Sequence, residues 1–155
     1  MKIITLTGKK QSGKWKLAYN WAKNENVSFI NPYTTAKKRP QDMIYLDRTK
    51  LAEKSNNENV LCSTIINGET YVFFESQLNN DYNIMIVDDY ALGELVDTFD
   101  GDIIKVWVDN PKAESSDRNG HFYSRDYYDY IYNVGLDDPD VFLETLAFDT
   151  EMVQQ

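Results

Sequence analysis

Residues 3–15 read IITLTGKKQSGKW, and this stretch decides the fold. Its first part, Ile3–Leu6, is a short apolar run that predicts a strand. The segment Gly8–Lys14 that follows has the pattern G-x-x-x-x-G-K. A helix is predicted from residue 13 to residue 24, because Leu17, Ala18 and Trp21 recur at helical spacing. A strand, a glycine-rich loop and a helix in direct succession are the context that a phosphate-binding P-loop requires.

The loop has the chemistry of a phosphate cradle. Glycines let backbone N–H groups curl around a phosphate, and the helix N-terminus adds partial positive charge. Lys14 is expected to reach the β- and γ-phosphates of a bound nucleotide and to support transfer. The residues predicted to bind the nucleotide phosphates are Gly8, Lys9, Gln11, Ser12, Gly13, Lys14 and Trp15. The alternative interpretation of the pattern is a chance Gly-Lys pair in a turn.

One position departs from the P-loop pattern. Trp15 stands where Ser or Thr normally supplies a hydroxyl ligand to Mg²⁺. An indole cannot coordinate the ion, so metal would need water or acidic side chains. Residues 84–89, IMIVDD, offer such acids, because they form an apolar strand that ends in Asp88 and Asp89. We expect these two carboxylates to hold Mg²⁺ beside the loop, an exposed turn after a strand being the simpler alternative.

The remaining pattern alternates strands with helices and predicts an α/β fold with a parallel sheet flanked by helices. A small β-rich insertion interrupts it, since two strand-like runs flank Asn67-Gly68 and form a strong hairpin signal. Further strands are predicted at 27–30, 60–66, 69–74, 84–87, 103–108 and 131–134, further helices at 46–54, 91–99 and 138–148, and a basic loop at 33–40. The tyrosines at 128, 130 and 132 alternate and are expected to pack on one face.

Composition narrows the class of protein. The net charge is −9, and the 155 residues include one cysteine and no apolar run near the roughly 20 residues that span a membrane. Residues 1–50 carry 11 basic and 3 acidic side chains, whereas residues 51–155 carry 5 and 22. The acidic second half argues against nucleic-acid binding, and the basic first half suits a small polyanion such as a nucleotide. We expect one cytoplasmic domain without membrane contact.

Beyond the loop, the chain resembles the guanylate kinase family over nearly its whole length. Residues 33–40, YTTAKKRP, are similar to that family's T-T-R segment, with Thr34, Thr35 and Arg39 in register. Asn67-Gly68 and Tyr71 match its hairpin, and Asp88-Asp89 its acidic strand. The resemblance implies a P-loop core at 1–32 and 80–155, a monophosphate-binding insertion at about 33–79 and a shortened lid at about 112–126. It also implies transfer of phosphate from ATP to a nucleoside monophosphate with Mg²⁺.

The resemblance also implies residue roles. Lys14, Arg39, Arg118 and Arg125 would be the catalytic cations, Arg39 on the acceptor phosphate and the last two in the lid. The acceptor would be bound by Thr34, Thr35, Arg39, Tyr45, Cys62 and Tyr71. The chain departs from the family at Trp15, at Ala36 in place of an arginine, at Cys62 in place of the glutamate that reads guanine, and at Phe73 in place of a hydroxyl residue.

These departures leave two functions open. The first is a nucleoside monophosphate kinase with altered base preference, such as a divergent, phage-encoded relative. The second is a module without catalysis that binds a protein partner or a nucleotide without transfer. Retention of Lys14, Arg39 and the two aspartates favours the enzyme. The silent module is favoured by Trp15, Ala36 and Cys62.

Overall fold

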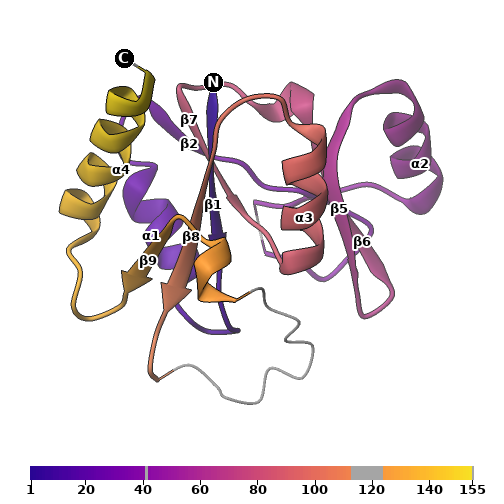
Figure 1. Ribbon diagram of the computed structural model, residues 1–155. Coiled ribbons are helices and arrows are strands. Elements are labelled where there is room, and N and C mark those ends of the chain that lie inside the picture. Colours follow the sequence, from indigo (N-terminus) through magenta and orange to yellow (C-terminus); the bar gives the residue numbers. More distant parts are fainter. Residues whose placement is uncertain (41, 113–123, 155) are drawn as a thin grey trace.

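A computed structural model of the chain describes residues 1–40, 42–112 and 124–154. Five parallel strands form the central sheet, in the order β2-β7-β1-β8-β9 (Figure 1). Their bounds are Lys2–Thr7 for β1, Val27–Phe29 for β2, Tyr82–Ile86 for β7, Ile103–Asp109 for β8 and Tyr130–Asn133 for β9. The apolar run Ile3–Leu6 therefore lies in the middle strand of the sheet.

Helices cover both faces of this sheet. Helices α1 (Lys14–Trp21) and α4 (Pro139–Gln154) lie together on one face, and α3 (Asp89–Thr98) covers the other (Figure 1). Residues on β1 alternate between the two cores: Ile4 and Leu6 pack with α1 and α4, whereas Ile3 packs with α3. The α/β sheet flanked by helices, predicted from the sequence, is confirmed.

The insertion between β2 and β7 forms a second, smaller sheet in the order β4-β3-β6-β5. Its strands are β3 (Tyr33–Thr34), β4 (Ile44–Tyr45), β5 (Val60–Ile66) and β6 (Glu69–Phe74), with α2 (Arg48–Asn57) packed against them. Two 3₁₀ turns complete the described elements, η1 (Glu75–Gln77) and η2 (Arg125–Tyr127). Figure 1 shows this unit beside α3, on the far side from α4.

The hairpin β5–β6 has the bounds that the sequence predicts. Asn67 and Gly68 join its strands with φ of 52° and 79°, the left-handed conformation that an Asn-Gly pair adopts readily. The basic loop predicted at 33–40 is partly wrong, because Tyr33–Thr34 forms β3 and pairs with β6. A two-residue strand is too short to show a period, and the partner that stabilises it lies nearly forty residues further along the chain.

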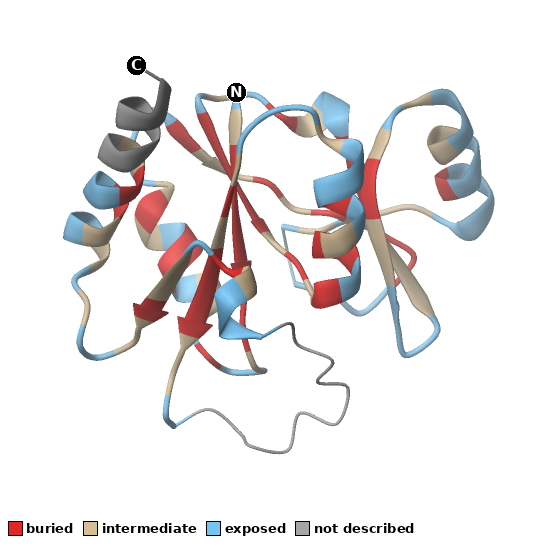
Figure 2. Cartoon of the chain, in the orientation of Figure 1, coloured by how far each residue is buried: buried red, intermediate tan, exposed pale blue. Residues whose placement is uncertain are grey.

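Burial follows the two layers (Figure 2), with red residues along the central strands and pale blue at the tip of the hairpin. The tyrosines expected on one face are divided between both. Tyr130 and Tyr132 pack on the α1–α4 side, while Tyr128 packs with Trp107 on the α3 side. The period of two fails there because Tyr128 precedes β9 and follows the turn η2. No helix in the described part of the chain is long and apolar enough to cross a membrane.

Candidate functional site: a cleft between the central sheet and the insertion

A cleft of about 980 Å³ opens at the carboxyl ends of β1, β2 and β7 and is closed on its other side by the β5–β6 hairpin. The connections after β1 and β7 leave toward opposite faces of the sheet, and such a switch point is where open α/β sheets bind ligands. Its walls are formed by Gly8, Lys10, Lys14 and Trp15, by Phe29 to Pro32 and Met43, by Ser63 to Asn67, Tyr71 and Phe73, and by Ile86 to Ala91.

The loop from Gly8 to Lys14 depends on its glycines. A Cβ on Gly8 would stand 2.6 Å from the backbone oxygen of Val108, so only glycine allows β1 to pass this close to β8. Gly13 has φ of 99° and turns the chain into α1, and Gln11 also has positive φ, at 62°. The Lys14 ammonium donates to the Gly8 carbonyl over 2.6 Å and lines the cleft. Gly8, Lys14 and Trp15 therefore meet at one wall.

Trp15 contributes an aromatic surface at the place where a hydroxyl was expected. Its ring packs edge-on against Phe29 of β2, with centroids 5.2 Å apart, and is tilted against Tyr19 of α1 at 6.2 Å. The Tyr19 hydroxyl bonds the carboxylate of Asp42, which raises the Tyr19 pKa and ties α1 to the insertion. The wall beside Lys14 is therefore apolar and aromatic.

The two aspartates after β7 have different surroundings. Asp88 caps α3: its Oδ1 accepts from the Ala91 N–H at 2.8 Å, while its Oδ2 accepts from the Thr64 hydroxyl at 2.5 Å. The first contact begins a helix and the second joins the hairpin to the central sheet. Asp89 is buried and accepts from the Tyr128 hydroxyl at 2.8 Å. Both residues line the cleft, and each also holds a structural contact.

The hairpin wall combines hydroxyl and aromatic groups. Cross-strand pairing places Cys62 opposite Phe73 and Thr64 opposite Tyr71, so these four share the face turned toward the central sheet. Phe73, Thr64 and Tyr71 line the cleft, whereas Cys62 is fully buried in the core formed with α3. Burial, with Glu94 and Asp88 nearby, raises the pKa of the Cys62 thiol far above its ordinary value, so it stays neutral.

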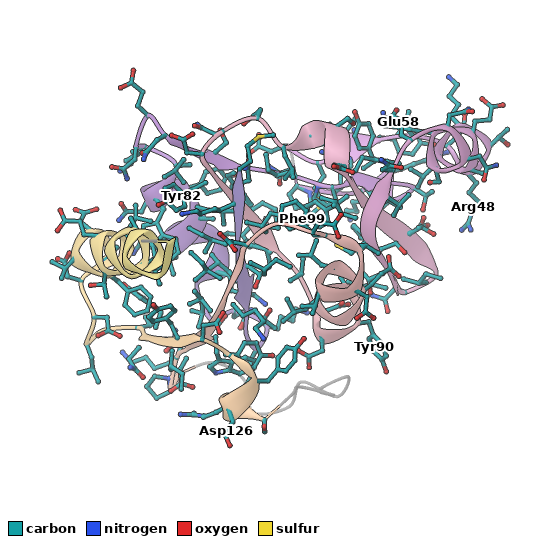
Figure 3. All side chains as sticks on the ribbon, turned by 45° about the horizontal axis from the view of Figure 1, so that its top comes forward. Arg48, Glu58, Tyr82, Tyr90, Phe99 and Asp126 are labelled. Atoms are coloured by element: carbon teal, nitrogen blue, oxygen red, sulfur yellow. The ribbon has the colours of Figure 1, made fainter. Side chains whose placement is uncertain are left out.

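Two of the other expected acceptor-binding residues, Thr35 and Tyr45, lie around a second depression on the insertion. Thr35, Lys37, Lys38, Tyr45 and Arg48 line it, and Arg48 projects from the outer end of α2 (Figure 3). Much of the positive charge of the first fifty residues is therefore outside the main cleft. Thr34 is fully buried, and its hydroxyl accepts from the Ala36 N–H at 3.0 Å.

The expected catalytic arginines are distributed over several segments. Arg39 donates to the backbone oxygens of Met43 at 3.1 Å and Lys37 at 2.9 Å, with its guanidinium 5.2 Å from the centre of the Tyr45 ring. Arg125 forms an ion pair of 3.3 Å with Asp109 at the end of β8. Arg118 lies outside the described residues, as does most of the expected lid.

A divalent cation fits these residues only as a hydrated ion. Trp15 offers no oxygen, Asp89 is held in the core by Tyr128, and the described residues include no cluster of three His, Cys, Asp or Glu that could form a metal site. Asp88 has two occupied oxygens, but an ionised carboxylate has about four lone-pair positions. It can therefore accept from the water shell that Mg²⁺ retains.

Several cleft residues were not predicted from the sequence. Phe29, Asn31 and Met43 form the wall beyond Trp15, and Thr64 reaches Asp88. Their positions depend on how β2, the segment at 43 and the hairpin meet in space. The available signal is that Phe29 and Asn31 lie at and just beyond the end of a predicted strand, and parallel α/β sheets bind ligands at that edge.

The fold of the chain is similar to the crystal structure of a guanylate kinase from Anaplasma phagocytophilum. The TM-score is 0.66 at 16% sequence identity, and the match covers 99% of this chain and 86% of that one. No protein-family model and no curated protein sequence matches the chain. The likeness shows a guanylate kinase-like fold, with a parallel α/β sheet flanked by helices.

Proposed function

We propose that the chain is a nucleoside monophosphate kinase that transfers the γ-phosphoryl group of ATP to a ribo- or deoxynucleoside monophosphate. The observation that carries the proposal is the junction of the Gly8–Lys14 loop with the cleft. The loop opens onto a space large enough for a nucleotide, and the walls of that space combine aromatic rings with polar and charged side chains. Donor phosphates on the loop and an acceptor in the cleft would place the two reacting groups side by side.

Lys14 has the central role in this proposal. Its ammonium now donates to the Gly8 carbonyl, at the place where the loop would bind phosphate oxygens. With a nucleotide bound, the ammonium would exchange this contact for the β- and γ-phosphates and neutralise charge that develops during transfer. Ser12 supports this arrangement, because its buried hydroxyl lies in the loop and has no hydrogen-bond partner among the described residues.

Arg39 would grip the acceptor phosphate after a local rearrangement. Its two hydrogen bonds within the described residues are to backbone oxygens of its own segment, and its side chain is exposed. A phosphate competes well for a guanidinium, since two parallel charge-assisted bonds replace two bonds to neutral carbonyls. The same rearrangement would bring Arg39 past Met43, which lines the cleft. Tyr71 lines the cleft and would be the hydroxyl donor to the acceptor, whereas Thr35 and Tyr45 line the second depression.

Mg²⁺ would accompany ATP and spread the negative charge of its phosphates. In this chain Asp88 would bind the hydrated ion through water, while its carboxylate continues to cap α3. Asp89 would support Asp88 from the core. The protein's own contribution to the chemistry is thus mainly positioning and positive charge, which suffices for in-line transfer of a phosphoryl group.

The test is ADP formation with ATP, Mg²⁺ and each nucleoside monophosphate in turn. Turnover with at least one acceptor is expected, and Lys14→Ala should reduce it by at least about a hundredfold. Lys16→Ala is the matched control, because Lys16 is an exposed lysine of the same helix outside the loop pattern. It should keep the activity. Absence of turnover with every acceptor, at protein concentrations near that of the substrate, would contradict the kinase.

A second function is favoured by specific observations: a domain that binds a nucleotide, or a protein partner, without transfer. Trp15 fills the position of the metal-ligating hydroxyl with an aromatic ring, and Thr64 occupies one oxygen of Asp88. ATP binding that depends on Lys14, with no transfer to any acceptor, would establish binding without transfer. A protein-binding module would instead keep its partner in the Lys14→Ala variant.

A further inference from the structure

The phosphate loop is strongly basic. Lys9, Lys10 and Lys14 lie within it, and the chain has no acidic residue before Glu25. Lys10 and Lys14 both line the cleft. Gly13 precedes α1 without a side chain that could cap the helix, and the first turn of α1 contains no acid. The loop therefore presents three ammonium groups and the positive end of a helix dipole, with no carboxylate of its own segment to offset them.

Trp15 removes the direct metal ligand from this basic loop. Its indole lines the cleft and packs against Phe29, with the ring centres 5.2 Å apart. The indole has one N–H donor and no acceptor atom, so it cannot coordinate a cation. Asp88 offers a cation a contact through water, because its two oxygens already accept from Thr64 and Ala91. An ion held behind its own water shell interacts more weakly with the protein than a coordinated one.

We propose that the loop binds the triphosphate of ATP about equally well with and without Mg²⁺, because Lys9 and Lys10 supply positive charge while Trp15 withholds the metal ligand. This inference rests on the proposed function, since it concerns how the same loop holds ATP. An ammonium is a compact point charge that binds phosphate without a fixed coordination geometry. Transfer to an acceptor can still use the hydrated ion beside Asp88, so binding and transfer differ in their need for metal.

The first test measures the affinity of the purified protein for ATP by calorimetry, in excess Mg²⁺ and in EDTA at the same ionic strength. The two dissociation constants should agree within about threefold, below the roughly 5- to 150-fold coupling that is typical of linked ligands. A preference of about tenfold or more for ATP with Mg²⁺ would overturn the inference and leave the kinase proposal standing. Absence of ATP binding in both buffers would overturn this inference together with the proposed nucleotide site.

Substitutions at Trp15 test the role of the indole. Trp15→Ser supplies a hydroxyl at the metal-ligating position of the P-loop pattern, so ATP should bind at least about fivefold more tightly in Mg²⁺ than in EDTA. Trp15→Phe is the matched control, because it keeps an aromatic ring against Phe29 and adds no oxygen. Its two dissociation constants should agree as they do in the parent chain. If the Ser and Phe variants respond alike to Mg²⁺, Trp15 does not decide the metal dependence and the inference fails.

Lys10→Ala tests where the compensating charge lies. It should weaken ATP binding in EDTA by at least about threefold, and by less in Mg²⁺, because the ion offsets part of the lost charge. Lys23→Ala removes an exposed lysine beyond the other end of α1 and should change neither dissociation constant. If Lys10→Ala binds ATP in EDTA as tightly as the parent chain, the lysine of the loop does not replace the charge of the metal and the inference is wrong.

Discussion

The two walls of the cleft differ in how they are built. The wall at the end of β1 is made largely of backbone, and its glycines have the geometry that the phosphate-loop pattern requires at Gly8 and Gly13. The wall on the hairpin is made of side chains, among them Thr64, Tyr71 and Phe73. A wall built from backbone therefore depends mainly on its glycine positions, whereas a wall built from side chains depends on each residue that lines it.

The largest loss in the free energy of unfolding is expected when a side chain is truncated in one of the cores behind the two walls. Leu92→Ala removes a fully buried side chain between α3 and the central sheet and should lower the free energy of unfolding by about 3–5 kcal/mol. Leu51→Ala acts in the small core of the insertion, which it shares with Val72 and Phe74. A small core can collapse around the cavity, so we expect about 2–3 kcal/mol.

Urea denaturation of these two variants tests whether the walls unfold together. All three tryptophans, at 15, 21 and 107, lie outside the insertion, so their fluorescence reports on the central sheet, while circular dichroism reports on both units. Coincident transitions are expected for Leu51→Ala as for the parent chain. A circular-dichroism transition at a lower urea concentration than the fluorescence transition would show that the insertion unfolds separately. The two walls would then belong to two units that unfold independently.

The next largest loss of stability is expected from a substitution in the backbone wall. Gly8→Ala places a Cβ 2.6 Å from the Val108 backbone oxygen, which cannot move without displacing β8, and should lower the free energy of unfolding by about 1–3 kcal/mol. ATP affinity should fall as well. Gly101→Ala is the matched control, since its Cβ would clash with the end of the Phe99 ring, also at 2.6 Å, and a side chain can rotate away. If both variants lower the free energy of unfolding by the same amount, the close approach to the Val108 backbone oxygen does not require glycine at position 8.

Sequence alone was sufficient for the backbone wall and insufficient for the side-chain wall. The order of strand, loop and helix around Gly8–Lys14 is encoded locally, so the sheet, the loop and the Asn67-Gly68 hairpin were predicted correctly. The position of the Arg39 guanidinium depends on Met43 and Tyr45, and the second role of Asp88 depends on Thr64, twenty-four residues away. Contacts of this kind arise from tertiary packing and leave no periodic signal in the sequence.

The contact between the walls is the next prediction. Thr64→Val removes the hydroxyl that donates to Asp88 but keeps the shape of the side chain, and should lower the free energy of unfolding by about 1–2 kcal/mol, because the acceptor is charged. Thr64→Ser restores the donor and should recover most of this loss. Chemical denaturation of the three proteins provides the measurement. If Val and Ser variants prove equally stable, the hydroxyl of Thr64 does not join the hairpin to the sheet.

The smallest loss of stability is expected from an ion pair in the insertion, whose contribution should depend on pH. Lys54 lies 4.7 Å from the centre of the Tyr33 ring, and its ammonium donates to Glu58 over 2.5 Å. Lys54 and, to a lesser extent, the Ser76 hydroxyl lower the Glu58 pKa from its ordinary value of 4.5. The bond to Glu58 in turn raises the Lys54 pKa above 10.5, against the opposing effect of burial.

The shifts in the Glu58 and Lys54 pKa values define the pH range over which the ion pair stabilises the fold. The lowered Glu58 pKa contributes stability above pH 4.5 that is lost as pH falls through the folded value, and the raised Lys54 pKa contributes stability below pH 10.5 that is lost as pH rises through its folded value. Glu58→Gln should therefore be slightly less stable than the parent at neutral pH, with the difference vanishing at low pH. Urea midpoints at pH 7 and pH 3 measure it. A difference that persists unchanged at pH 3 would mean that shape, rather than charge, holds this end of α2 to the hairpin.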